Sequence, residues 1–288
     1  MKLPPFDYAC PATLAEAVSL LASHAGEAKV IAGGQSLMPM MAYRLATPSL
    51  LVDLRKVAGL DRIDIGKEGV RLGAKVRWRD ILDSEALRKA HPLLVAAIAH
   101  VAHYQIRNRG TVGGSLAHAD PAAEMPGIAV TCDGVITVVG KAGTRVVRAA
   151  DFFRGALTTV LQPDEIITDV RLPAWPSARR WGFEEFSRRR GDFALGAVAV
   201  FYDEDGLSRA KDVHIGVIGA SNRPRRIKEA EAVLNGRGVT EALIVEAGRA
   251  VSAVVDPPDD IHASAAYRRA LAGTLTERAL MRAAGAAR

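Results

Sequence analysis

The chain has 288 residues, and at roughly 150 residues per domain this length predicts about two domains. Its composition, 49% hydrophobic and 24% charged, is that of a folded globular protein and excludes collagen-like, disordered and disulfide-rich classes. The net charge is +6, but the basic residues are scattered, and the two densest clusters, 188–190 and 223–228, lack the interleaved aromatic residues of single-strand binders. We therefore expect no nucleic-acid partner.

Membrane insertion and secretion are not predicted either. No run of about 18 apolar residues is free of charges, and the first seven residues lack an apolar signal core, so a cytoplasmic location is expected. The two cysteines, Cys10 and Cys132, are far apart and form no CxxC pattern. Because an iron–sulfur cluster needs about four thiolates, any such cluster must lie on another chain.

The first sixty residues alternate between helix and strand signals. Residues 13–16 fit the capping-box pattern, and apolar residues at 14, 17, 18 and 21 predict a helix behind it. A buried strand over 29–32 enters a glycine turn, a helix is expected over 36–45, and a second buried strand covers 50–54.

The middle of the chain carries shorter signals that end at a linker. A half-exposed strand is predicted over 69–74, a helix over 80–89, and a second helix from Pro92 with Leu94, Ile98 and Val101 on one face. Short strands are predicted over 135–139, 145–148 and 166–172. Residues 173–177, rich in proline, read as the linker between two domains.

Beyond the linker the pattern changes to strands followed by helices. Strands of a meander are predicted over 197–202 and 210–218, and helices over 228–234, 241–254 and from 264 towards the end. This order indicates a compact α+β module over residues 177–288.

Two glycine-rich segments carry the chemistry. The first is Ala32 to Leu37, with Gly33–Gly34 followed by Gln35 and Ser36, and the second is residues 109–115, with Gly113–Gly114 between hydroxyl residues. Glycines let backbone amides converge on a bound anion without a Cβ in the way. Two such turns about 80 residues apart predict a grip on one pyrophosphate from two sides.

Each segment alone is weak evidence, because a Gly–Gly pair is more often an ordinary turn. Neither matches the G-x-G-x-x-G fingerprint or the P-loop pattern, so a Rossmann site or a nucleotide triphosphatase is not supported.

His118 and Asp120 lie two apart, but no third ligand follows at a useful spacing, so no metal site is predicted. His100 and His103 are interpreted as packed or half-exposed residues of a helix, and Arg188 to Arg190 as either a partner contact or a solvated run.

The flanks of the two segments resemble a known family. Residues 29–40, KVIAGGQSLMPM, and residues 105–121, QIRNRGTVGGSLAHADP, are similar to the FAD-binding medium subunit of the molybdenum hydroxylases, the family of xanthine dehydrogenase and aerobic carbon monoxide dehydrogenase. The resemblance runs essentially end to end. It implies an α+β fold with a two-lobed FAD-binding domain of the vanillyl-alcohol-oxidase (PCMH) type over residues 1–176, lobes 1–56 and 57–176, and a smaller C-terminal domain over 177–288.

The resemblance also implies a set of FAD contacts. Residues 30–37 and 111–115 should line the pyrophosphate and the nearby ribose, Glu124 falls near the adenosine half, and Val101 and Ile167 match apolar positions that touch the cofactor. The expected cofactor-binding residues are Val30, Ile31, Ala32, Gly33, Gly34, Gln35, Ser36, Leu37, Val101, Thr111, Gly113, Gly114, Ser115, Asp120, Glu124, Ile167 and Ser187. Several relatives carry a lysine near the flavin where Ser187 stands, so the redox potential and the electron acceptor are left open.

The function implied by the resemblance is electron transfer. FAD on this chain would take electrons from two [2Fe–2S] clusters on a small subunit, while substrate is oxidised at a molybdopterin site on a large subunit, in a dimer of heterotrimers. No catalytic side chain is expected here, and the electrons pass to an external acceptor. Gln35 and Ser115 stand where carbon monoxide dehydrogenase relatives often carry a histidine and an acidic residue, so the resemblance favours an N-heterocycle or aldehyde substrate over carbon monoxide. The alternatives are a self-contained flavin oxidase or reductase and a non-catalytic nucleotide-binding module.

Overall fold

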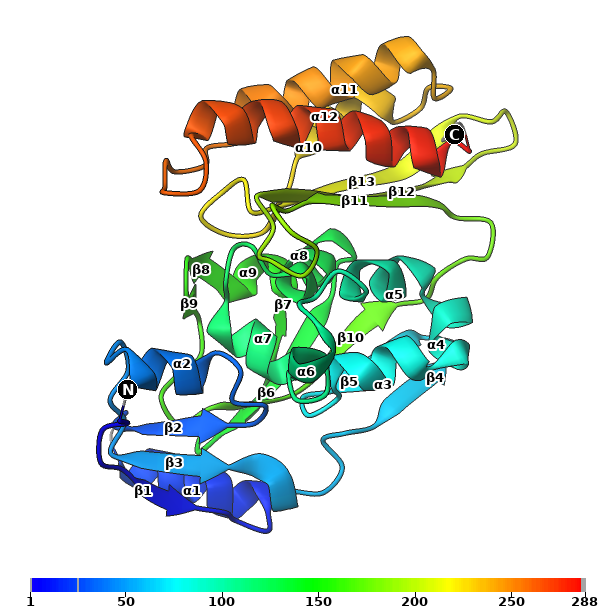
Figure 1. Ribbon diagram of the computed structural model, residues 1–288. Coiled ribbons are helices and arrows are strands. Elements are labelled where there is room, and N and C mark those ends of the chain that lie inside the picture. Colours follow the sequence, from blue (N-terminus) through cyan, green and yellow to red (C-terminus); the bar gives the residue numbers. More distant parts are fainter. Residues whose placement is uncertain (1, 25, 286–288) are drawn as a thin grey trace.

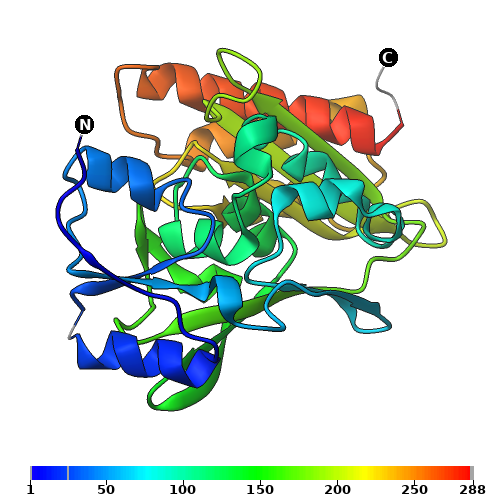
Figure 2. The same cartoon turned by 60° about the horizontal axis from the view of Figure 1, so that its bottom comes forward.

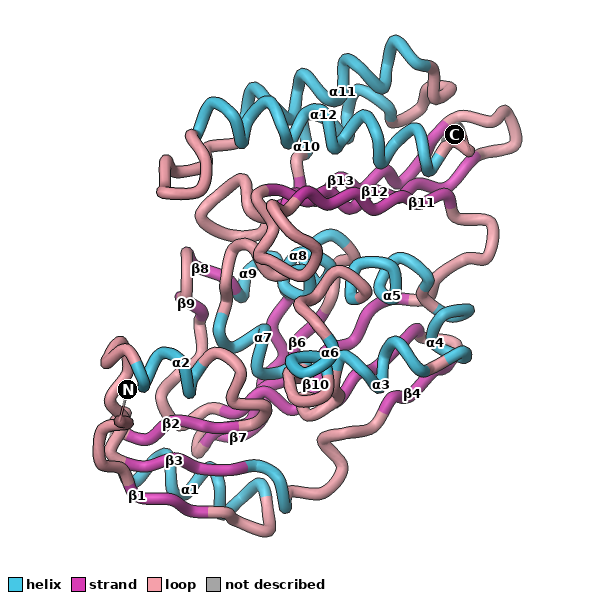
Figure 3. The backbone as a smooth tube through the Cα atoms, in the orientation of Figure 1, coloured by secondary structure: helices cyan, strands magenta, loops and turns pink. Residues whose placement is uncertain are grey.

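The computed structural model describes residues 2–24 and 26–285, which form three layers along the long axis of the molecule (Figure 1). A small lobe with the N-terminus lies at one end. A five-stranded sheet with its covering helices lies in the middle. A four-stranded sheet backed by long helices forms the other end (Figure 3). Within the described residues, no helix is long and apolar enough to span a membrane.

The N-terminal lobe is a parallel three-stranded sheet with a helix against it. Thr13 caps the first helix through the predicted capping box, in which Glu16 Oε2 accepts the Thr13 amide at 3.1 Å. Pro39 lies in the first turn of the second helix, where its missing N–H costs no hydrogen bond. The strands, in the order β1-β3-β2, are β1 (Asp7–Ala9), β3 (Leu50–Asp53) and β2 (Ala28–Ile31), and the helices are α1 (Leu14–Ser23), α2 (Leu37–Ala42) and the 3-10 turn η1 (Leu54–Lys56).

The second lobe is an antiparallel sheet with short helices on one face. Its strands, in the order β4-β5-β10-β6-β7, are β4 (Ile63–Gly66), β5 (Gly69–Gly73), β10 (Ile166–Pro173), β6 (Val135–Gly140) and β7 (Gly143–Arg148). The helices are α3 (Trp78–Asp83), α4 (Glu85–Ala90), α5 (Pro92–Ile98), α6 (Tyr104–Arg107), α7 (Val112–His118), α8 (Glu124–Thr131) and α9 (Ala149–Phe152), followed by the small hairpin β8 (Phe153–Gly155) and β9 (Thr158–Thr159). Ile166 of β10 belongs to the core of the first lobe, so the two lobes lie against each other, as Figure 2 also shows.

Two helix predictions in this lobe are wrong in detail. The helix expected over 80–89 is broken at Ser84, whose hydroxyl accepts the Leu87 amide at 3.2 Å and starts a new helix. The helix from Pro92 ends at Ile98, so Val101 and His100 lie beyond it, and His103 caps α6 instead of sharing a helix with His100. In both cases the apolar spacing continues after the backbone has left the helix.

The C-terminal domain confirms the predicted meander. Its strands pair antiparallel in chain order and are β11 (Arg180–Phe186), β12 (Gly196–Glu204), β13 (Ala210–Ile218) and β14 (Arg225–Arg226). The helices α10 (Lys228–Leu234), α11 (Glu241–Val254) and α12 (Ala265–Ala283) cover one face, and α8 of the second lobe lies against the other (Figure 1).

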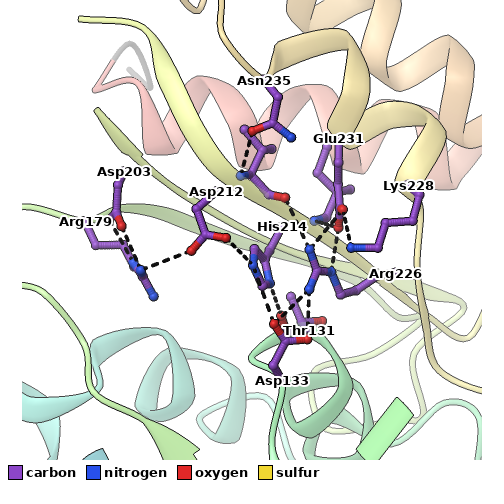
Figure 4. A network of polar contacts seen from close by, with 12 residues as sticks. Thr131, Asp133, Arg179, Asp203, Asp212, His214, Arg226, Lys228, Glu231 and Asn235 are labelled. Atoms are coloured by element: carbon purple, nitrogen blue, oxygen red, sulfur yellow. Dashed lines mark hydrogen bonds and ion pairs between the residues drawn. The ribbon is translucent and has the colours of Figure 1, made fainter. Parts of the chain in front are cut away.

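A polar network fastens α8 to this sheet (Figure 4). His214 on β13 places Nδ1 2.7 Å from the Thr131 carbonyl oxygen at the end of α8. Arg226 on β14 donates to Asp133, just past α8, at 2.8 Å, and to the buried Glu231 of α10 at 2.7 Å. These contacts cross from the second lobe into the C-terminal domain, so the two units are held by directional bonds as well as by apolar packing.

Candidate functional site

The two glycine turns lie side by side although they are far apart in the sequence. A Cβ on Gly33 would collide with the carbonyl oxygen of Arg109, and it would lie 3.0 Å from the Cα of Gly110. Arg109 Nε also donates to the Gly33 carbonyl oxygen at 3.4 Å. Only a residue without a side chain permits this approach. The predicted meeting of the two segments is therefore confirmed.

The first turn offers backbone donors. No acceptor among the described residues takes the amides of residues 33–37, and this stretch is half-buried. Gly34 has φ +72°, and the Gln35 side-chain amide bends back to the Gly33 carbonyl at 3.0 Å. Successive unpaired N–H groups around a left-handed residue form a concave anion-binding turn. The turn fits the diphosphate of a dinucleotide in its acceptor-free donors and in the left-handed backbone at Gly34.

The second turn does not offer the same donors. The four amides that follow Thr111 all have internal acceptors, so the prediction of free backbone donors in this segment is wrong for them. The donors and acceptors are Val112 N to Val76 O at 2.9 Å, Gly113 N to Ala74 O at 2.8 Å, Gly114 N to Thr111 Oγ1 at 3.2 Å and Ser115 N to Thr111 O at 3.0 Å. Gly113 is required for packing instead, because its Cβ would lie 3.0 Å from the Ala74 Cα. The segment supports the first turn and presents the half-buried Ser115 hydroxyl.

The remaining expected contact residues fall into two groups. Val30 and Ile31 end β2 and Leu37 opens α2, so they continue the first turn. Ile167 is buried in β10. It lies close to the second turn, since the carbonyl of the neighbouring Thr168 accepts the amide of Ala74 at 2.9 Å and the carbonyl of Ala74 accepts the amide of Gly113.

Val101, Asp120, Glu124 and Ser187 belong to the seam between the second lobe and the C-terminal domain. Asp120 Oδ1 accepts the Ala122 amide at 2.8 Å in the turn before α8, and the Ser187 hydroxyl donates to the Arg189 carbonyl at 2.8 Å. The Ser187 hydroxyl is therefore already used within its own loop.

A buried carboxyl pair lies in this seam, and half of it was missed from the sequence. Glu124 is only 8% exposed at the start of α8, and the side chain of Glu185 on β11 is 2% exposed, with Oε2 lacking a hydrogen-bond partner in the described structure. His100 Nδ1 lies 3.6 Å from the other oxygen of Glu185. Strand alternation places Glu184 and Glu185 on opposite faces, but nothing in the sequence tells which face meets a second carboxyl.

Burial, reinforced by the negative charge of Glu185, raises the pKa of Glu124 to about 8. The carboxyl is therefore largely protonated at neutral pH. A protonated carboxyl donates one hydrogen bond and accepts others, so Glu124 can act as a donor as well as an acceptor.

The raised pKa predicts a pH-dependent stability. Between the ordinary pKa, near 4.5, and about 8, unfolded chains lose the Glu124 proton while folded chains keep it, so this group costs stability as the pH rises through that window. The quantity to measure is the unfolding free energy of Glu124→Gln minus that of the native protein as a function of pH. We expect this difference to increase, in favour of the variant, by on the order of 3 kcal/mol from pH 5 to pH 8. The exposed Glu68→Gln should show no such trend. A constant difference between Glu124→Gln and native protein would contradict the assignment.

Comparison with known proteins decides the family. The FAD-binding domain of molybdopterin dehydrogenases matches residues 4–175, and the C-terminal domain of the carbon monoxide dehydrogenase flavoprotein matches residues 181–283. The chain is a molybdenum hydroxylase medium subunit. Both the fold expected from the resemblance and the presence of an FAD-binding domain are thereby confirmed for this medium subunit.

Individual relatives cover the medium subunit from end to end. The nicotine 6-hydroxylase medium subunit of Paenarthrobacter nicotinovorans is 44% identical over 98% of this chain and 99% of its own length. In the structure of quinoline 2-oxidoreductase from Pseudomonas putida 86, the matching chain has a TM-score of 0.94 and 38% identity, with 99% of both chains covered. Carbon monoxide dehydrogenase from Hydrogenophaga pseudoflava gives a TM-score of 0.96 at 33% identity, with both chains covered completely.

Proposed function

We propose that this medium subunit is the FAD-carrying electron-transfer component of a heterotrimeric molybdenum hydroxylase. It takes electrons from two [2Fe–2S] clusters of a small subunit and passes them to an external acceptor, while substrate is oxidised at the molybdenum site of a large subunit. The observation that carries the proposal is the run of acceptor-free amides at residues 33–37, set against Arg109 and Gly110. With two cysteines, the chain has too few thiolates for a cluster of its own.

The residues proposed to hold the cofactor are those expected from the sequence, with divided roles. The amides of Gly33, Gly34, Gln35 and Ser36 bind the diphosphate. The second turn holds this loop in place, with Thr111 capping α7, and adds the hydroxyl of Ser115. In the seam, protonated Glu124 offers a hydrogen-bond donor to the adenosine half of the cofactor.

FAD supplies redox chemistry in steps of one or two electrons, which suits a relay between clusters and an acceptor. The chain itself positions the cofactor, sets the charge around it and controls which acceptor reaches it. No side-chain nucleophile or general base is assigned. Ser187 brings no charge, and its hydroxyl donates to the backbone carbonyl of Arg189. Positive charge in this loop therefore has to come from exposed arginines such as Arg188.

The substrate proposed for the holoenzyme is an N-heterocycle. The relatives named for nicotine and quinoline share 44% and 38% identity with this chain, against 33% for the carbon monoxide dehydrogenase structure. Gln35 and Ser115 favour the same class. We further propose a dimer of heterotrimers in the cytoplasm and a domain division at residue 176.

Purification with the two partner subunits tests the proposal. We expect a yellow complex with one FAD for each medium subunit, whose flavin absorbance is bleached by an N-heterocyclic substrate only when all three subunits are present. A colourless medium subunit after gentle co-purification would contradict FAD binding. Steady-state turnover by the isolated chain would support the alternative, a self-contained flavin oxidase or reductase.

A further inference from the structure

A continuous surface joins the loop between β11 and β12 to the segment around α6. The loop descends from the C-terminal sheet in front of α8 and meets the connection between α5 and α6 (Figure 1). At the meeting point Gly191 has φ +89°, and a Cβ there would lie 2.7 Å from the Ala102 carbonyl oxygen. At its other end the segment reaches the first glycine turn through Arg109 and Gly33. The surface, defined as residues 103–109 and 187–193, therefore reaches the proposed FAD site at Arg109.

This surface carries an excess of positive charge. Arg109 and Arg188 to Arg190 are exposed, and Arg107 is half-buried, where it donates to the Ala99 carbonyl at 3.2 Å. None of the five forms an ion pair with an acidic residue in the described part of the chain. Asp192 is the acidic residue within the surface, while Asp120 is half-buried and Glu185 points inward at His100.

Exposed aromatic residues lie in or next to the same two chain segments as these arginines. Tyr104 is 65% and Phe193 72% exposed, and Phe186 is partly exposed beside them in the chain. Aromatic residues and arginine are the residue types enriched in the energetic centres of protein interfaces. A small inorganic anion needs the charge but not the rings, so the combination favours a larger partner, and arginine with aromatic residues is the pairing typical of protein interfaces.

We propose that residues 103–109 and 187–193 form the docking surface for an acidic, one-electron carrier protein that serves as external acceptor. The inference rests on the proposed electron-transfer function. Permanent subunit interfaces are large, apolar and depleted of charge, whereas electron-transfer encounters are small and steered by complementary charge. A surface with five arginines and one acidic residue fits the second kind. Each encounter transfers one electron, so two carrier molecules are reduced for every electron pair withdrawn from one substrate molecule.

Matched probes of opposite charge test the inference. Native cytochrome c is basic, and its fully succinylated form is acidic with the same haem. The substrate-reduced holoenzyme is mixed with each oxidised probe, and the second-order rate of haem reduction is followed against salt concentration. We expect the acidic probe to react at least tenfold faster at low salt, with a rate that falls steeply as salt screens the attraction. Binding of each probe to the oxidised holoenzyme, measured by ultracentrifugation, should rank in the same order.

Charge-reversal variants separate the surface from the overall charge. Arg189→Glu with Arg190→Glu should slow the acidic probe at least tenfold and speed the basic one, while Arg189→Lys with Arg190→Lys stays within about threefold of the native rate. Arg249→Glu with Arg278→Glu makes the same charge change on the exposed side of α11 and α12 and should have little effect.

The possible outcomes divide clearly. Equal loss in both charge-reversal pairs, or no preference for the acidic probe, overturns the inference. Loss of a subunit from the Arg189→Glu, Arg190→Glu complex would mean that the surface is a permanent interface. Ferricyanide serves as a small anionic probe, and a variant that reduces ferricyanide more slowly but the acidic cytochrome at the native rate would mean a small anionic acceptor. Each of these also overturns it. Failure of the substrate to bleach the flavin of the native complex would instead contradict the proposed function itself.

Discussion

Replacement of Gly33 by alanine should strip FAD from the protein almost completely. The added methyl group collides with the Arg109 carbonyl oxygen and presses on Gly110, so the first turn must move away from the second. The amides of residues 33–37 then no longer converge on one point. We expect FAD affinity to fall at least 100-fold, which corresponds to about 3 kcal/mol, measured by titration of the FAD-free protein with FAD.

Gly66→Ala is the matched control for this loss. Gly66 ends β4, and an added Cβ there meets nothing within 4 Å, so FAD content should equal that of the native protein. Circular dichroism of Gly33→Ala should show an intact fold, because the turn lies at the surface of the lobe. Native FAD affinity in Gly33→Ala would refute the diphosphate assignment for this turn.

The second large effect is expected on stability. Arg226→Met removes the guanidinium that donates to Glu231 at 2.7 Å and to Asp133 at 2.8 Å (Figure 4). Glu231 is buried, and the exposed Lys228 at 2.9 Å would be its remaining cation. Breaking a buried pair from one side costs about 3–5 kcal/mol, so we expect a loss of about 3 kcal/mol in the unfolding free energy, measured in urea.

Two further variants show whether the loss comes from the buried charge. Arg226→Met with Glu231→Gln should recover at least half of the stability, because a neutral amide replaces the stranded carboxylate and still accepts the Ile215 amide. Arg225→Met, next in the chain and outside the network, should cost less than about 1 kcal/mol. Equal losses in Arg225→Met and Arg226→Met would show that the network adds nothing specific.

Local elements of the fold are readable from the chain because their determinants lie within a few residues. The capping box at Thr13 and Glu16 forms as predicted. The helices α10 and α11 have the predicted bounds, because their apolar residues recur at helical spacing. The break at Ser84 shows the limit of this approach. A side chain that can cap a new helix also fits inside a continuous pattern, and the packing of α3 against α5 and of α4 against β4 and β5 decides between the two.

In the candidate site, too, some features could be predicted from the sequence and others depend on residues that are distant in the chain. Its glycine segments are visible in the sequence, yet the acceptors of the Val112 and Gly113 amides lie nearly forty residues earlier, at Val76 and Ala74. No local pattern reveals such partners. The run of free amides at residues 33–37 is likewise defined only once the neighbouring chain segments are in place.

By itself the sequence determined the family, many of the helices and strands, and the meeting of two glycine turns, because spacing, capping and the need for a missing Cβ are properties of short segments. The tertiary structure alone decided which of those turns keeps its amides free. It also decided that the carboxyl groups of Glu124 and Glu185 are both buried near each other in the seam. Hydrogen-bond competition and desolvation depend on what surrounds a group in space, and residues distant in the chain supply those surroundings.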